Sequence, residues 1–147
     1  MIHNILSEPS GPVYRSLLAF AAQRSSLFSL VWRRQLAFDA SADALATSLR
    51  PHLDNEKETS EWPGTELLGH TAIVRRYRLS PESTSLLASA ESLYAWLAPQ
   101  RPEDLAFYTS EGRCWLGSIA HERDAYVDLD PAEFELLRAA VPGLDIR

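Results

Sequence analysis

The sequence predicts an α+β fold, with a mixed or antiparallel sheet of about five strands and helices packed mainly on one side. Segments with apolar residues at helical spacing alternate with segments rich in β-branched and aromatic residues. The connections are short, and the last three strands follow one another as a meander, which favours antiparallel pairing. A chain of 147 residues with 46% hydrophobic residues can bury its own core. Residues 1–147 are therefore predicted to form a single domain.

The first half of the chain is predicted to contain two helices, one strand and a loop. A helix follows residues 10–12, because the proline of this Ser-Gly-Pro segment suits a first helical turn. Residues 27–38 have apolar side chains at period two, which indicates a long strand. A second helix is expected over 42–49 and is ended by Pro51. Residues 54–65 are rich in charges and contain Pro and Gly, so we expect a loop there.

The second half is predicted to contain four strands and two helices. Ser-Pro-Glu at residues 80–82 is a strong helix start, and apolar residues continue at three-four spacing to Leu97. Asp-Pro-Ala-Glu at residues 130–133 combines a capping box with proline at the first helical position, which predicts the last helix. The predicted strands span 67–79, 105–108, 114–119 and 125–129.

Charge and composition indicate which partners and compartments to expect. Twenty Asp and Glu against fourteen Lys and Arg give a net charge of −6, which disfavours broad binding to nucleic acids or anionic membranes. Residues 1–10 do not resemble a signal peptide, and the apolar stretch 13–32 is interrupted by two arginines. The single cysteine, Cys114, allows no intramolecular disulfide. These features predict a cytoplasmic protein.

Two arginines are predicted on apolar strand faces. Arg34 lies among the aromatic residues of the 27–38 strand, and Arg75 lies within the 67–79 strand. An arginine there must pair with a carboxylate, reach solvent or line a cleft. One interpretation is an anion-binding or acidic-partner site, because guanidinium binds carboxylates and phosphates in bidentate fashion. The alternative is a structural ion pair, with Glu61, Glu122 or Asp128 as the acid, or a strand end that emerges into water.

Two histidines and a tryptophan are the other candidate site residues. His121 and Glu122 are adjacent where a strand ends, but neighbours on a strand point to opposite faces, so a charged turn is the simpler interpretation. Trp62 follows Glu61 in a Pro-Gly loop, and it is either an exposed binding anchor or folded over the core edge. His70 could meet His121 in space, yet the histidines lack paired ligand spacing, so no metal site is predicted.

Familiar catalytic and cofactor motifs are absent from the sequence. It contains no G-x-G-x-x-G, Walker loop, C-x-x-C or G-x-S-x-G. Cys114 stands in an apolar run and is interpreted as a structural thiol. We therefore expect no cofactor and assign no catalytic residue.

Several segments resemble a family of small bacterial proteins without an established activity, some of which carry sporulation-type labels. The resemblance is carried by Ser-Glu-Trp-Pro-Gly-Thr at 60–65, Leu-Tyr-Ala-Trp-Leu at 93–97, Pro-Glu-Asp-Leu-Ala-Phe-Tyr at 102–108 and Ser-Ile-Ala-His-Glu at 118–122. It extends from Glu58 onward. It implies a bacterial source but no mechanism.

Three functional hypotheses follow. The first is a non-catalytic binding domain, possibly of the immunity type that neutralises a basic toxin, with Glu56, Glu58 and Glu61 attracting the partner. The second is a homodimer built on an exposed strand edge or apolar patch. The third is a small-molecule or anion-binding enzyme, in which His70, His121 and Glu122 would converge with Arg34 or Arg75.

Overall fold

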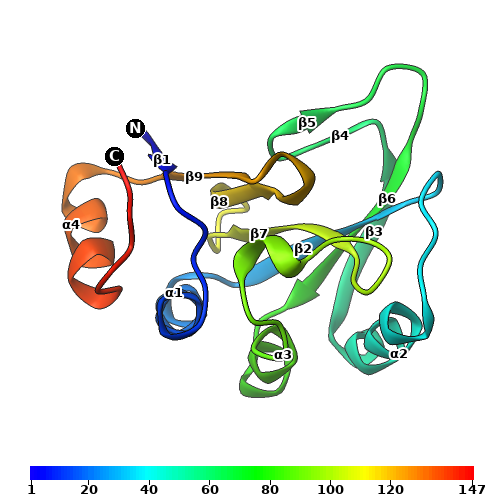
Figure 1. Cartoon of the computed structure of the whole chain (residues 1–147), viewed down its shortest axis with the longest axis horizontal. Helices are drawn as coiled ribbons and strands as arrows, with labels where there is room; N and C mark the ends of the chain where they lie inside the picture. The colour runs from blue at the N-terminus through cyan, green and yellow to red at the C-terminus, as the bar shows by residue number, and fades with distance from the viewer.

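The computed structural model describes residues 1–147 and contains a seven-stranded sheet, a separate two-stranded hairpin and four helices (Figure 1). The strand order in the sheet is β1-β9-β8-β7-β2-β6-β3, and every neighbouring pair is antiparallel. The α+β class is confirmed, and the sheet is larger than the five strands predicted. The strands are β1 Ile2–Ile5, β2 Leu27–Arg33, β3 Leu53–Thr59, β4 Glu61–Trp62, β5 Thr65–Glu66, β6 Ala72–Arg78, β7 Glu103–Tyr108, β8 Cys114–Ile119 and β9 Asp124–Asp128. The helices are α1 Pro12–Arg24, α2 Ala40–Leu49, α3 Pro81–Leu87 and α4 Pro131–Ala140.

The helices begin where the sequence places their caps. The Asp39 carboxylate accepts hydrogen bonds from the backbone of the first turn of α2, and Ser80 forms a capping box at α3. Asp130 accepts from the backbone N–H of Glu133 at 2.8 Å at the start of α4. These short-range signals are reliable because they satisfy backbone donors that the helix itself leaves unpaired.

Two predicted elements end earlier than the apolar pattern suggests. The 27–38 strand stops at Arg33, and Arg34 lies in the turn that follows. The helix expected to continue to Leu97 ends at Leu87, and only a short 3₁₀ turn forms later, at residues 93–95. The Ser89 hydroxyl donates to the Leu86 carbonyl at 2.6 Å, a local bond that competes with helix continuation.

Four strands lie in places where the sequence analysis predicted none. β1 is only four residues long and pairs with β9. β4 and the first residue of β5 lie in the 54–65 segment, for which the prediction of a loop was wrong. β3 occupies the first half of the same segment. Its charged side chains show no apolar alternation, because β3 is an edge strand that pairs only with β6 and faces solvent.

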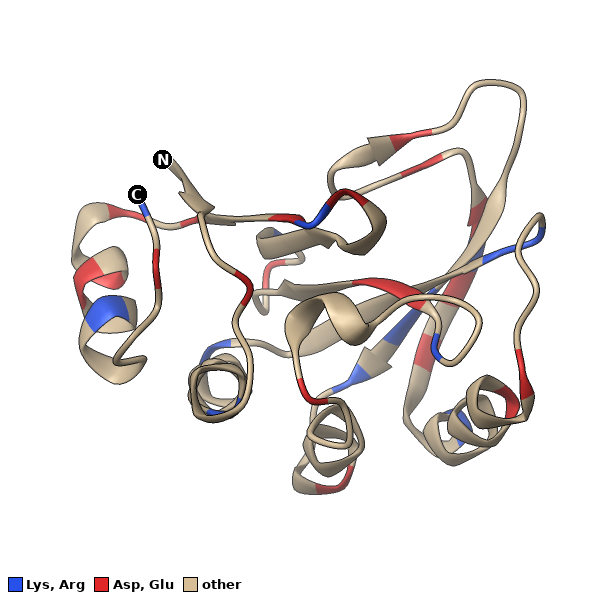
Figure 2. Ribbon diagram, in the orientation of Figure 1, with Lys and Arg blue, Asp and Glu red and all other residues tan.

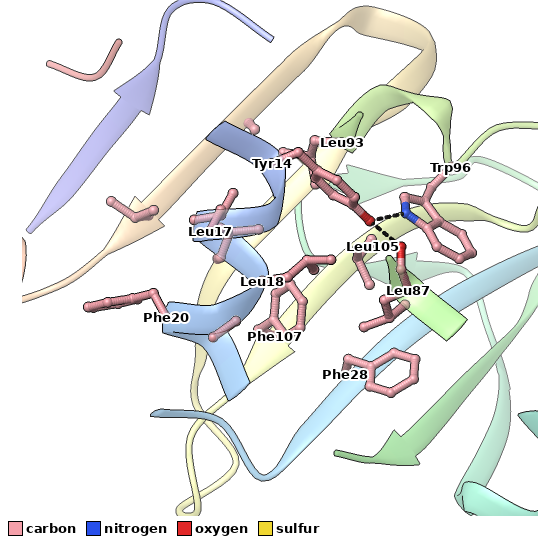
Figure 3. Close-up of a cluster of buried hydrophobic side chains, with 14 of the residues drawn as sticks. Tyr14, Leu17, Leu18, Phe20, Phe28, Leu87, Leu93, Trp96, Leu105 and Phe107 are labelled. Carbon is pink, nitrogen blue, oxygen red and sulfur yellow. Dashed lines mark hydrogen bonds between the residues drawn. The ribbon is translucent and has the colours of Figure 1, made fainter. Parts of the chain in front are cut away.

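The main core lies between the sheet and helices α1, α3 and α2, which lie side by side in this order along one face of the sheet (Figure 1). Helix α4 packs beside α1. At the centre of this core the Tyr14 hydroxyl donates to the Leu87 carbonyl at 2.7 Å and accepts from the Trp96 indole N–H at 2.9 Å (Figure 3). The Tyr14 hydroxyl thus connects α1 with the end of α3 and with the residue that follows the 3₁₀ turn. All three residues are fully buried, and a buried hydroxyl needs such hydrogen-bond partners because water cannot reach it.

The β4–β5 hairpin folds over the sheet face opposite the helices (Figure 1). Trp62 forms a second apolar cluster there with Val31, Ala72 and Val74. Gly64, at the turn of the hairpin, has φ of +86°, and a Cβ at this position would come within 2.8 Å of the Ile119 side chain. A glycine is therefore required for the hairpin to approach β8 this closely.

The two edges of the sheet differ. Beyond β1, the backbone of Asn4 exchanges hydrogen bonds of 2.9 Å with Arg147 in both directions, so the C-terminal residues cover this edge. No strand pairs with the outer side of β3. No helix of the structure combines the length and the apolar character needed to span a membrane.

Candidate functional site

Two adjacent carboxylates, Glu103 and Asp104, are buried at the start of β7, each 2% exposed. Neighbouring residues on a regular strand point to opposite faces. Here the register between β2 and β7 shifts, because Val31 pairs with Glu103 whereas Ser29 pairs with Ala106. One extra β7 residue forms a β-bulge, and Asp104 has a left-handed φ of 57°. The bulge brings both carboxylates to one place.

Asp104 is held by two hydrogen bonds. Its Oδ2 accepts from the Trp62 indole N–H at 2.8 Å, and its Oδ1 accepts from the Ala120 backbone N–H at 3.0 Å. The first bond fastens the β4–β5 hairpin to the sheet. The second fixes the turn between β8 and β9.

Glu103 is less completely satisfied. Its Oε2 accepts from the Ala98 backbone N–H at 3.2 Å. Its Oε1 is buried and has no hydrogen-bond partner, and the nearest guanidinium nitrogen, on Arg33, stands 3.9 Å away. Native proteins rarely leave a buried carboxylate oxygen in this state.

His121 completes the cluster, with its side chain 45% exposed. One ligand atom each from Glu103, Asp104 and His121 lie within 4.8 Å of one another. His121 belongs to a 3₁₀ turn over residues 120–122, which ends at Arg123 with a left-handed φ of 55°. We call these three residues the carboxylate–histidine cluster.

Burial dominates the electrostatics of the cluster. It raises the pKa of Glu103 and the pKa of Asp104, because a desolvated carboxylate is disfavoured. Hydrogen bonds from the Ala98 backbone to Glu103, and from Trp62 and the Ala120 backbone to Asp104, oppose the shifts. The two carboxyl groups of the cluster therefore hold protons more readily than exposed acids do.

The two predicted arginines form ion pairs with glutamates of β3 and do not converge on the histidines. Arg75 Nε lies 2.9 Å from Glu56 Oε2, and Arg34 lies 3.3 Å from Glu58 Oε2. Arg75 and Glu56 are direct cross-strand partners. The acids are thus not the ones predicted, because 54–65 was interpreted as a loop. Both guanidinium groups are bound to glutamates, which leaves the converging arrangement of the third hypothesis unsupported.

The remaining predicted site residues differ in their exposure and in their contacts. Trp62 is 7% exposed, so its interpretation as an exposed anchor is wrong and the alternative, a ring folded over the core edge, is what the structure shows. Glu61 and His70 are exposed. His121 Nε2 lies 3.9 Å from Glu122 Oε1, because the two residues stand in a 3₁₀ turn and not on a strand. His70 is not part of the cluster.

A second candidate surface is the outer side of strand β3, which we call the β3 edge. Five of its seven residues are exposed, and none is buried. Asp54, Glu56 and Glu58 outnumber the one basic residue, Lys57. Figure 2 shows these acidic positions along β3, beside the arginines of β6. The β3 edge therefore combines unpaired backbone groups with negative charge.

Sequence reasoning did not single out Glu103 and Asp104. The available signal was an acidic pair directly preceding the apolar run Leu-Ala-Phe-Tyr, which together form a strand buried at every residue. Acids at the end of a buried strand are costly unless they have partners. The two segments 102–108 and 118–122 meet in the cluster.

Cys114 is expected to react slowly with alkylating reagents in the folded protein. Burial raises the pKa of its thiol to about 11, and only the thiolate reacts. Iodoacetamide at pH 8 should modify it at least about 100-fold more slowly than in urea-unfolded protein, which mass spectrometry measures. Between pH 8 and 10 the rate should rise about tenfold per unit. Equal rates in folded and unfolded protein would contradict this expectation.

No family model, curated protein or solved structure matches the chain. The carboxylate–histidine cluster and the β3 edge are therefore the two features of the molecule that bear on its function.

Proposed function

We propose that the chain is a non-catalytic protein-binding domain that holds a basic, extended segment of a partner along the β3 edge. A single observation carries this proposal: β3 is an exposed, acidic edge strand whose outer backbone groups have no strand to pair with. An extended peptide can bind such an edge by adding a strand, with backbone hydrogen bonds giving affinity and side chains giving specificity. An immunity-type protein that neutralises a basic toxin in the bacterial cytoplasm belongs to this class.

The charges of β3 favour a basic partner. Glu56 and Glu58 each contact an arginine of their own chain, yet about half of each side chain stays exposed, at 51% and 49%. Glu61 is also exposed on the neighbouring hairpin. Lysine or arginine in an added strand would approach these carboxylates, and their attraction would speed association in a salt-dependent way.

The same charges disfavour a homodimer through this edge. Two copies of β3 related by a two-fold axis normal to the sheet would place Glu56 opposite Glu56 or opposite Glu58 in the central registers. Like charges directly opposite one another destabilise antiparallel pairs. A protein with a basic strand is therefore the occupant that the β3 edge fits best.

Affinity capture with three forms of the tagged chain tests the proposal. The edge variant carries Glu56→Gln, Glu58→Gln and Glu61→Gln. The control variant carries Glu91→Gln, Glu111→Gln and Glu135→Gln, three exposed acids outside β3 and β4, so that the net charge changes equally. We expect one basic protein from the source lysate to bind the unmodified chain and the control at low salt, and to be lost from the edge variant and at high salt.

Two outcomes would refute the proposal. A partner retained equally by the edge variant and by the control would show that β3 is not the binding surface. No partner retained by the unmodified chain would remove the binding function itself.

A further inference from the structure

We infer that the carboxylate–histidine cluster is a binding site for a divalent transition-metal cation, with Glu103, Asp104 and His121 as its three protein ligands. This inference is independent of the β3 edge. It also departs from the expectation, drawn from histidine spacing alone, that the chain has no metal site. The only histidine of the site lies seventeen positions after the two adjacent carboxylates, so no histidine spacing motif reveals the three ligands.

The donor set fits such a cation. Two carboxylates and one imidazole are the oxygen and nitrogen ligands that Zn²⁺ and Mn²⁺ accept. The ligand atoms lie within 4.8 Å of one another. Two ligands of a tetrahedral Zn²⁺ stand about 3.4 Å apart, given metal–ligand distances of about 2.1 Å. The ligand atoms therefore have to move together by up to about 1.4 Å on binding, and the half-exposed His121 ring is the group freest to move.

A second observation points to a ligand at this place. Glu103 Oε1 is buried and makes no hydrogen bond. Asp104 Oδ1 and Oδ2 each accept one hydrogen bond and retain lone pairs that can coordinate. A cation would satisfy the Glu103 oxygen and neutralise two desolvated carboxylates together, which the single Arg33 at 3.9 Å does not do.

The backbone conformation and the hydrogen bonds around the cluster hold its carboxylates in a fixed arrangement, as in a preformed binding site. The left-handed φ of Asp104 and the bulge in β7 are unfavourable backbone conformations, and here they bring both carboxylates to one place. Trp62 and the Ala120 backbone fix Asp104 from two sides, as outer partners fix metal ligands. Three protein ligands leave at least one coordination position for water or another oxygen ligand.

Cation binding to the tag-free full-length chain tests the inference. After treatment with EDTA and its removal, the protein is titrated with ZnCl₂ by isothermal calorimetry and with MnCl₂ by the loss of the free-ion electron paramagnetic resonance signal. We expect one equivalent of at least one of the two cations to bind with micromolar or tighter affinity. The same cation should raise the thermal midpoint of unfolding.

Three variants assign the binding to the cluster. Glu103→Gln removes a ligand without changing the side-chain shape, and His121→Gln removes a half-exposed ring, so both should remain folded. Each should weaken cation binding by at least about tenfold. His70→Gln is the matched control, because His70 is exposed and outside the cluster, and it should bind as the unmodified chain does.

Three results would overturn the inference. These are no binding of either cation at up to millimolar concentration, unchanged affinity in His121→Gln and Glu103→Gln, or an equal loss of affinity in His70→Gln. The last result would identify adventitious binding to surface histidines.

Discussion

Replacing Trp96 by alanine should lower the free energy of unfolding by about 3–5 kcal/mol, the cost of emptying a fully buried tryptophan site. The loss has two parts. The indole fills the space beside Tyr14 and Leu87, and its N–H donates to the Tyr14 hydroxyl at 2.9 Å. Because domains of this size are stable by only about 5–15 kcal/mol, the variant should unfold at much lower urea concentration. Circular dichroism across a urea series measures the shift.

Two conservative variants separate packing from hydrogen bonding at this site. Trp96→Phe keeps most of the apolar volume and should cost less than Trp96→Ala. Tyr14→Phe keeps the ring but leaves the Leu87 carbonyl and the Trp96 indole N–H without their partner, which should cost about 1–3 kcal/mol. If the free energy of unfolding of Trp96→Ala lay within about 1 kcal/mol of that of the unmodified chain, Trp96 would not be the core residue described above.

Replacing Trp62 by alanine should release the β4–β5 hairpin from the sheet. The substitution removes the centre of the small apolar cluster and the hydrogen bond to Asp104, so a loss of about 3 kcal/mol or more is expected for the folded hairpin. Without these two contacts of Trp62, the hairpin should detach locally before the rest of the sheet unfolds. Limited proteolysis should then cut within residues 60–71, where the unmodified chain resists.

Trp62→Phe is the matched variant for this prediction. It keeps a ring against Val31, Ala72 and Val74 but leaves Asp104 Oδ2 without a donor, which should cost about 1–3 kcal/mol. Cleavage should therefore be intermediate between Trp62→Ala and the unmodified chain. Unchanged cleavage in Trp62→Ala would show that the hairpin is held by something other than this side chain.

Local chemistry made much of the fold predictable. Asp39, Ser80 and Asp130 satisfy backbone donors within one turn, so their neighbours in sequence suffice to place the helix starts. The strand at 114–119 was predicted with its observed bounds, because it is apolar and buried along its length. Both kinds of signal depend on residues that are close together in the chain.

The elements that sequence patterns missed depend on distant partners. β3 is a strand because β6 lies beside it and because arginines of β6 and of the turn after β2 form ion pairs with its glutamates. No pattern within 53–59 reveals these partners. The carboxylate–histidine cluster needs a bulge against β2 and a turn seventeen positions further along the chain. Histidine spacing could not reveal a site that contains a single histidine, in a 3₁₀ turn, and two carboxylates at the start of β7.

The pairing of β1 with β9 constrains the order in which the chain acquires its structure during synthesis. Ile2 is synthesised well before its partner Asp128, which lies 126 positions further along the chain. Until then β1 has no sheet to join, and β8 presents an open edge of buried, apolar residues. Such an edge invites wrong pairing in an incomplete chain. A nascent chain stalled before residue 124 should therefore depend on chaperones far more than the finished protein does.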